Sequence, residues 1–268
     1  MERKVIALLC RTSDRTPGAS RGAEALARLV ATQTGSDPVM VGSFGEPAPH
    51  GWEDDLRDSR GCILEAGGQI EDALGEGRTP LLFASECSIA LTTLPTVLRE
   101  RPGTKVLWLD AHADFNSPET TPSGYLGGMC LAGACGVWDA GVIGAIDPAQ
   151  VVICGAREID PGERMLLERS GITIVAAGEP AVAQVRLALD GAPVFVHLDV
   201  DVIDPDEMPA QFPASGGFAP DALRSLLEAV LEDCELVGAE VTALEERDYA
   251  PVALDVLTPI LEETRVSH

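Results

Sequence analysis

The sequence predicts a three-layer αβα fold, with a mostly parallel sheet of about eight strands between two layers of helices. Two observations predict this fold. Short apolar runs alternate along the chain with longer segments that have helical periodicity. Most of these runs are continuously apolar, as is typical of parallel strands covered on both faces. The chain of 268 residues shows no linker, so we expect a single domain, residues 1–268.

The expected elements follow one another in regular alternation. The apolar, β-branched runs predict strands at 4–10, 38–42, 79–84, 104–109, 150–155, 172–176, 193–199 and 236–242. Apolar positions three and four residues apart predict helices at 20–32, 56–75, 88–100, 161–170, 180–190, 219–232 and 250–264. We expect Ser88 to cap the third of these helices and Pro220 to lie in a first helical turn, where proline is tolerated. Stretches rich in Gly and Pro predict long loops at 43–55, 114–128 and 204–218.

The composition is strongly acidic, with a formal net charge of −24 and a pI near 4.3. Nucleic acids and anionic membrane surfaces are polyanions, so this charge argues against both as partners. A cationic small molecule or a metal ion suits the charge better. The first apolar run is too short for a secretory signal, and no run of apolar residues is long enough to span a membrane.

Cysteine usage predicts a reducing, cytoplasmic compartment. The cysteines are odd in number, scattered and mostly inside apolar segments, which is typical of buried thiols. They are Cys10, Cys62, Cys87, Cys130, Cys135, Cys154 and Cys234. No CxxC pair is present to indicate structural zinc.

Two acidic clusters stand where predicted strands end. Asp110–Asp114, which reads Asp-Ala-His-Ala-Asp, follows the run 104–109, and Asp199-Val-Asp201 closes the run 193–199. The carboxyl ends of parallel strands meet at the ligand-binding edge of a sheet. Carboxylates and imidazole suit Mn²⁺, Fe²⁺ or Zn²⁺, and buried carboxylates need cations. One cluster alone could be a turn whose Asp residues bind backbone; the two together predict a divalent-metal site.

The clusters resemble the signatures of the ureohydrolases, the arginase and agmatinase family. The family motifs DAHxD and SxDxDxxDP correspond to Asp110–Asp114 and His197–Pro205. The resemblance extends over most of the chain from about residue 79. It implies an arginase-like fold, two divalent ions, expected to be Mn²⁺, and a metal-bridging hydroxide that attacks the carbon of a guanidino substrate. It also implies a homo-oligomer, either a trimer or a hexamer.

The resemblance assigns roles to individual residues. It makes Asp110 and Asp199 bridging metal ligands, and it places Asp114 at one ion and His112 with Asp201 at the other. Asp114 would also act in catalysis, by hydrogen bonding to the hydroxide. Three positions match residues that hold the amino and carboxylate groups of an amino-acid substrate: Asn116, Ser123 and Asp160.

Three positions depart from the family pattern. Cys87 stands where the family has a metal-binding His, and it is either a softer ligand or a small buried hydrophobe. Gly127 replaces a proton-transfer His, so water, Tyr125 or another loop must do that work. Ala243 replaces the carboxylate that binds the guanidinium group. Glu245 could reach back if the strand continues, or it could belong to a solvated acidic run.

The same departures at residues 87 and 127 resemble the family members that hydrolyse N-ω-hydroxy-L-arginine. An N-hydroxylated guanidine is less basic and needs a charge partner less. We therefore expect hydrolysis of a guanidino C–N bond, with N-ω-hydroxy-L-arginine as the preferred substrate and ornithine and hydroxyurea as products. The alternatives are arginase or agmatinase activity proper, and a degenerate member that binds a ligand without turnover.

The histidines allow two further predictions. A deacetylase-like zinc enzyme of related fold would need His-rich loops, and the chain has only four His residues, so we do not favour it. His197 stands where relatives often have Ser, and we expect it to be a packed, hydrogen-bonded core residue rather than a metal ligand.

Overall fold

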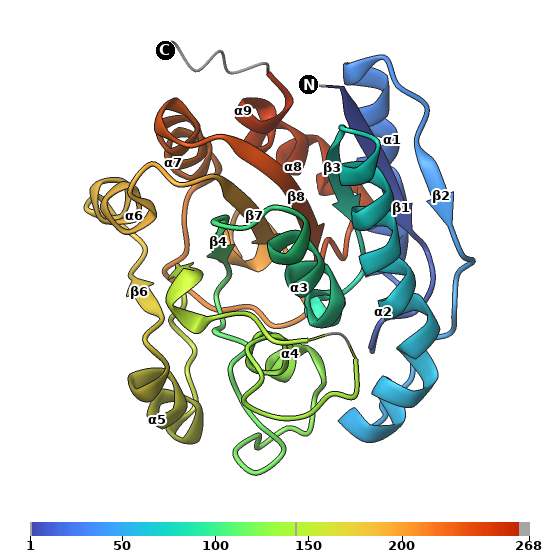
Figure 1. Cartoon of the computed structure of the whole chain (residues 1–268). Coiled ribbons are helices and arrows are strands. Elements are labelled where there is room, and N and C mark those ends of the chain that lie inside the picture. Colours follow the sequence, from blue (N-terminus) through green and yellow to red (C-terminus); the bar gives the residue numbers. More distant parts are fainter. Residues whose placement is uncertain (1, 143, 263–268) are drawn as a thin grey trace.

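The computed structural model describes residues 2–142 and 144–262, and every expected strand is present in one parallel sheet. The strands are β1 (Arg3–Leu8), β2 (Val39–Val41), β3 (Thr79–Phe83), β4 (Lys105–Leu109), β5 (Val151–Cys154), β6 (Thr173–Val175), β7 (Val194–Asp199) and β8 (Leu236–Thr242). Their order in the sheet is β2-β1-β3-β8-β7-β4-β5-β6 (Figure 1). The predicted strand runs and the parallel sheet are therefore confirmed.

The helices agree with the expected periodic segments, with differences at their ends. They are α1 (Ala19–Thr34), α2 (Trp52–Gly75), α3 (Ala90–Glu100), α4 (Cys130–Ala134), α5 (Pro161–Ser170), α6 (Ala181–Leu189), α7 (Pro220–Asp233), α8 (Ala250–Val256) and α9 (Thr258–Leu261). The short α4 was not expected. The segment 250–264 is divided at Leu257, where α8 has ended and α9 begins at Thr258 with Pro259 in its first turn, where proline is tolerated. The last two positions of the segment lie outside the described residues.

Two local predictions have different outcomes. Pro220 is the first residue of α7, as expected. Ser88 does not cap a helix: it lies inside the 3-10 turn Cys87–Ile89, and its hydroxyl donates to the carbonyl oxygen of Thr12. The prediction for Ser88 is wrong because the chain enters α3 through that turn, which uses the serine to bind the loop after β1.

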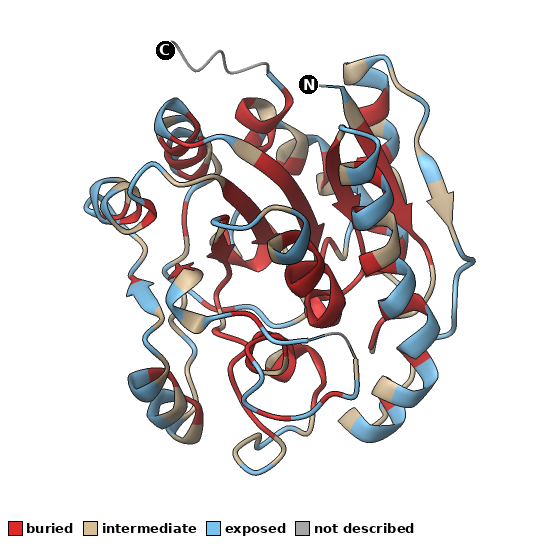
Figure 2. Cartoon of the chain, viewed as in Figure 1, coloured by how far each residue is buried: buried red, intermediate tan, exposed pale blue. Residues whose placement is uncertain are grey.

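Helices cover both faces of the sheet. The core on one face contains side chains of α1, α6, α7, α8 and α9, and the core on the other face contains side chains of α2, α3, α4 and α5. Strand β7 contributes Val196 and Leu198 to the first core and Phe195 to the second. Its residues are buried on both faces (Figure 2), which explains why the run looks continuously apolar. Each such buried aliphatic side chain stabilises the fold by roughly 1.5–3 kcal/mol.

The cysteines depart from the prediction of seven reduced thiols. A disulfide joins Cys10, in the loop after β1, to Cys62 on α2. The other five cysteines are free and buried. The pair escapes sequence reasoning because its members are 52 residues apart and meet only when α2 packs beside β1.

Four neighbouring strands in the middle of the sheet deliver the predicted site. Along the order β3-β8-β7-β4, the carboxyl ends are followed or closed by Cys87, Ala243, Asp199 and Asp110. Residues from four distant parts of the sequence thereby meet at one edge, as expected for a doubly covered parallel sheet.

Candidate active site and metal centre

One cavity collects all the predicted site residues except Glu245. Its lining includes Cys87, Asp110, His112, Asp114, Asn116, Ser123, Asp160, Asp199 and Asp201. The cavity volume is about 180 Å³. A single water needs roughly 10–15 Å³, so a small molecule fits beside metal ions.

The first acidic cluster is shaped by backbone donors. Asp110 directly follows β4, and its two carboxylate oxygens accept hydrogen bonds from the His112 amide (2.7 Å) and the Trp108 indole (3.0 Å). Strand β4 ends before the cluster, and Asp114 adopts a left-handed backbone with φ of 49°. This conformation is costly outside glycine, although aspartate tolerates it better than most residues. The side chains of Asp110, His112 and Asp114 line the cavity although β4 does not continue through them.

The second cluster is tied to the first. Asp199 ends β7, and its Oδ1 accepts from the backbone amide of Asp201 at 2.8 Å. Asp201 Oδ1 accepts from the amide of Ala111 at 3.0 Å, which links the two strand ends. His112 Nδ1 lies 3.0 Å from Asp201 Oδ2 and 3.4 Å from Asp110 Oδ1. These three residues offer ligand atoms within 4.8 Å of one another, as one bound ion requires.

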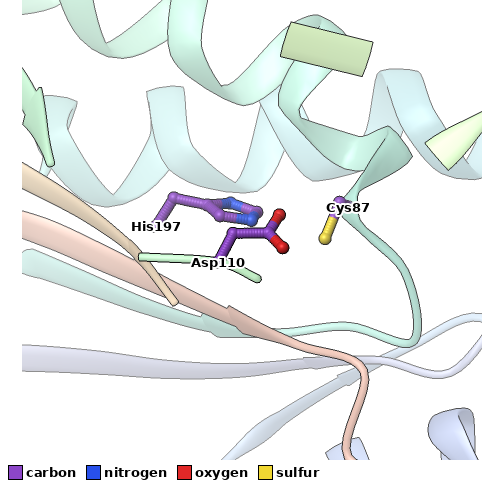
Figure 3. Close-up of side chains that lie close together, drawn as sticks. All are labelled: Cys87, Asp110 and His197. Atoms are coloured by element: carbon purple, nitrogen blue, oxygen red, sulfur yellow. The ribbon is translucent and has the colours of Figure 1, made fainter. Parts of the chain in front are cut away.

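Cys87 lies at the carboxylates, as a ligand would. Its thiol donates to Asp199 Oδ2 at 2.9 Å, and a second set of mutually close ligand atoms comes from Cys87, Asp110 and His197. Figure 3 shows the sulfur pointing toward the Asp110 carboxylate. Burial, together with the charges of Asp199, Asp114 and Asp110, raises the pKa of the thiol well above its usual value. The thiol is therefore protonated unless a cation offsets the surrounding negative charge.

The electrostatics of the cluster favour cations. Burial and neighbouring carboxylates raise the pKa of Asp114 and Asp199 well above the usual range, and they raise the pKa of Asp110 to about 6. Burial lowers the pKa of His112, but hydrogen bonds to Asp110 and Asp201 dominate and raise it to about 12. Burial acts to raise the pKa of Asp201, but the hydrogen bond and the charge of His112 outweigh it, so this pKa is lowered. Buried carboxylates that repel one another in this way fit divalent ions.

Tyr125 explains the glycine that replaces a family histidine. A Cβ atom at Gly127 would lie 2.5 Å from the Tyr125 ring, so the ring occupies the space next to this glycine. The Tyr125 hydroxyl donates to Glu86 Oε2 at 2.5 Å. Burial, followed by the charge of Asp14, raises the pKa of Glu86 well above its usual value. Both residues line the cavity.

Glu245 does not join the site. Strand β8 ends at Thr242, and Ala243 has a left-handed φ of 64°, so the strand does not continue to carry Glu245 to the same side. Ala243 lines the cavity, whereas the Glu245 carboxylate accepts from the Thr16 hydroxyl at 2.6 Å outside it. The expected reach of Glu245 toward a substrate is contradicted by this turn of the backbone.

Several lining residues were missed by sequence reasoning: Arg15, Glu86, Glu158, Glu163, Gln211 and Phe212. Arg15 comes from the loop after β1, where no motif marks it. Its guanidinium carbon lies 4.6 Å from the centre of the Tyr125 ring. Its Nε is buried and has no hydrogen-bond partner in the described part of the chain. Nη2 of the same guanidinium donates to the His50 carbonyl oxygen at 3.4 Å, so the group is held in place while Nε stays free. A positively charged group with a free donor at a cavity wall is suited to an anionic ligand group.

Glu163 holds the loop after the first cluster in place. Its carboxylate oxygens accept from the amides of Phe115 (2.8 Å) and Asp160 (3.1 Å), and burial raises its pKa to about 7. Asn116 Nδ2 donates to Asp160 Oδ2 at 3.0 Å, so two of the predicted substrate-binding residues already contact each other.

Comparison with known proteins gives the family. The family model described as the arginase family matches residues 9–246. The chain belongs to the arginase family. The family resemblance and the ureohydrolase type of enzyme predicted from the motifs are thereby confirmed, and the family is metal-dependent.

Relatives within the arginase family match most of the chain. The N(omega)-hydroxy-L-arginine amidinohydrolase of Streptomyces lavendulae is 37% identical over 262 residues, covering 94% of each chain. The arginase of Bacillus caldovelox is 30% identical over 217 residues, covering 72% of each. The arginase structure from Bacillus cereus superposes with a TM-score of 0.83 at 26% identity, covering 99% of this chain and 100% of that one. The arginase-like fold is therefore confirmed.

No helix among residues 2–142 and 144–262 has the length and apolar character needed to cross a membrane.

The metal-free protein should lose stability as the pH rises from about 5 to about 8. The pKa of Asp110 is about 6 in the folded protein, compared with an ordinary value of 3.8. The pKa of His112 is about 12 in the folded protein, compared with an ordinary value of 6.5. In both windows the folded state holds more protons, so rising pH favours unfolding. The lowered pKa of Asp201 acts oppositely only below 3.8.

Urea unfolding in EDTA across this pH range measures the effect. The Asp110→Asn variant should show a shallower decline, and added divalent ions should reverse the trend, because they bind deprotonated ligands. Metal-free stability that increases over the range would contradict the coupling assigned to the cluster.

Proposed function

We propose that the protein hydrolyses a guanidino C–N bond of an arginine-type substrate, with N-ω-hydroxy-L-arginine preferred. Water adds to the guanidino carbon and the bond to the δ-nitrogen breaks, which gives L-ornithine and hydroxyurea. The observation that carries the proposal is the convergence of two acidic clusters and Cys87 on one cavity that also holds Asn116 and Asp160.

The metal centre follows from the donor set. We assign Cys87, Asp110, Asp114 and Asp199 to a first ion, and Asp110, His112, Asp199 and Asp201 to a second. Two bound divalent cations, which we propose to be Mn²⁺, lower the pKa of water and so supply hydroxide at neutral pH. The Asp114 carboxylate lines the cavity and would accept a hydrogen bond from the nucleophilic water once the ions are bound.

The guanidino end of the cavity favours a weakly basic substrate. Ala243 offers no carboxylate there, and Glu245 is bound by Thr16 outside the cavity. A fully charged guanidinium would therefore lose its usual partner, whereas an N-hydroxylated guanidine is neutral more of the time. This supports hydroxyarginine over arginine, in line with the name of the Streptomyces lavendulae relative.

The other end of the cavity favours an α-amino acid. The Asp160 carboxylate suits the α-amino group, and the Asn116 amide, the Ser123 hydroxyl and the Arg15 guanidinium suit the α-carboxylate. A decarboxylated amine such as agmatine would leave Arg15 without an anionic partner.

Two alternatives remain for the same site. Arginase or agmatinase activity would produce urea from a fully basic guanidine. Binding of metal or ligand without turnover would follow if Cys87, Gly127 and Ala243 together mark lost chemistry. The intact Asp and His clusters favour catalysis.

Three broader proposals accompany this function. We propose that residues 1–268 form one arginase-like domain and that the protein assembles as a trimer or hexamer, as its family resemblance implies. We propose a cytoplasmic location, which the five buried free thiols support and the disulfide does not. Light scattering coupled to gel filtration would report the assembly.

Purified protein should release hydroxyurea and ornithine from N-ω-hydroxy-L-arginine with Mn²⁺, and act less efficiently on arginine and agmatine. Loss of a residue that hydrogen-bonds to a metal ligand typically costs roughly 10–100-fold in activity. Asp199→Ala removes a proposed ligand itself, so it should reduce turnover by more than this. The exposed Asp37→Ala is the matched control and should retain activity.

Product analysis and metal analysis together decide between the alternatives. Preferred release of urea from arginine or agmatine would replace the proposed substrate. No turnover of any substrate, with less than one metal ion per chain, would remove the enzymatic proposal.

Arg15→Met should raise KM for hydroxyarginine about 10-fold or more, because a charge-assisted hydrogen bond is lost. It should leave KM for N-hydroxyagmatine, which lacks the carboxylate, nearly unchanged. Steady-state kinetics on both substrates measure the difference. An equal effect on the two substrates would show that Arg15 does not bind the carboxylate.

Tyr125→Phe should lower kcat by about 100-fold while leaving metal content intact. The leaving amine needs a proton, and the Tyr125 hydroxyl with Glu86 forms a protic pair in the cavity beside Gly127. Phenylalanine keeps the ring that packs on Gly127, so the change isolates the hydroxyl group. An unchanged kcat would assign proton transfer to water or another residue.

A further inference from the structure

His197 lies between two strands that carry its partners. It pairs in register with Trp108 on β4 and with Glu240 on β8. Its ring stacks on the Trp108 indole with a centroid separation of 3.5 Å and an angle of 3°. Both His197 and Glu240 are completely buried. The imidazole is therefore held in a fixed orientation by three neighbouring strands.

The contact with Glu240 defines which nitrogen is free. His197 Nδ1 lies 2.7 Å from Glu240 Oε1. A neutral imidazole whose Nδ1–H donates to this carboxylate carries its lone pair on Nε2. This Nε2 is buried and has no hydrogen-bond partner among the described residues. A buried imidazole nitrogen without a partner is costly and calls for a ligand.

The His197 ring lies beside residues that we assign to the first metal ion. Figure 3 shows the His197 ring beside the Asp110 carboxylate, with the Cys87 sulfur beyond it. Ligand atoms of these three residues lie within 4.8 Å of one another. Metal bonds of about 2.0–2.1 Å to nitrogen and about 2.3 Å to sulfur place two opposed ligands roughly 4.4 Å apart. Small side-chain shifts therefore let one ion touch all three.

We propose that His197 Nε2 is a ligand of the first metal ion and supplies the imidazole missing at Cys87. The inference rests on the metal centre of the proposed function. Glu240 then plays the part of the carboxylate that orients a metal-bound histidine through its other nitrogen. The small Cys87 side chain leaves room for the ring, so the exchange at residue 87 and the His at residue 197 form one coupled change.

This ligand set also predicts a shift in metal preference. A thiolate and an imidazole at one ion favour Co²⁺ and Zn²⁺ over Mn²⁺ more strongly than carboxylates alone do. Co²⁺ is therefore a suitable probe, because a cobalt–thiolate bond gives its own near-ultraviolet absorption.

Metal-free protein would be titrated with Co²⁺ and studied by calorimetry, visible absorption and X-ray absorption. We expect two imidazoles per two ions, from His112 and His197. His197→Ser should reduce the number of bound imidazoles to one. It should also lower the affinity for the first ion on the order of 100-fold, while the second ion stays bound. Cys87→Ser should abolish the cobalt–thiolate absorption and keep both imidazoles.

Matched variants separate ligation from folding. His50→Ser removes a partly exposed histidine outside the cavity and should leave both ions bound with wild-type affinity. Glu240→Gln keeps a hydrogen-bonding group beside His197 Nδ1 and should lower the affinity for the first ion about 10–100-fold. Circular dichroism of each metal-free variant would confirm its fold.

Two results would overturn the inference. The first is a folded His197→Ser variant that binds both ions as the wild type does. The second, which holds even if that variant fails to fold, is a wild-type spectrum with only one imidazole per two ions. No substrate is present in these measurements, so absent hydroxyarginine turnover would contradict the proposed function and leave the assignment of His197 standing.

Discussion

The mutual repulsion of buried carboxylates at one edge of the sheet is the constraint on which the site depends. Asp110, Asp114, Asp199 and Asp201 are nearly excluded from solvent, and burial with like charge raises the pKa of the first three. Backbone amides and one histidine offset part of this repulsion. Protons or cations must supply the rest. The strand order of the sheet therefore determines the chemistry, because it sets β4 beside β7 and β7 beside β8.

Sequence predicted those features that one strand or one motif encodes by itself. The continuous apolar runs gave the strands, and the acidic clusters were found because each closes such a run. Features that depend on how the backbone turns after a strand were not predictable. Glu245 was expected at the site by extending β8, yet the left-handed Ala243 ends that extension. Ser88 was expected to cap a helix, yet a 3-10 turn gives its hydroxyl to the Thr12 carbonyl.

Contacts between distant segments were equally hidden. Arg15 enters the cavity from the first loop because its guanidinium lies over Tyr125, which is more than one hundred residues away in the chain. The Cys10–Cys62 disulfide joins the same loop to α2. Neither pairing has a local pattern, since each depends on helices and loops that pack only in the complete fold. Sequence reasoning therefore found the acidic clusters more completely than the rest of the cavity wall.

At two of the three positions that depart from the family pattern, a side chain from elsewhere in the chain lies where the family residue would be. Gly127 lacks a side chain, and the Tyr125 ring lies within contact of the position where one would begin. Cys87 lacks an imidazole, and the His197 imidazole lies close to both Cys87 and the Asp110 carboxylate. In both cases a small residue makes room for a larger functional group from a neighbouring position. Ala243 is different, because no carboxylate from Glu245 replaces the missing one. The uncompensated position is the one that would hold a guanidinium charge, and this is the physical reason for proposing a less basic guanidine as substrate.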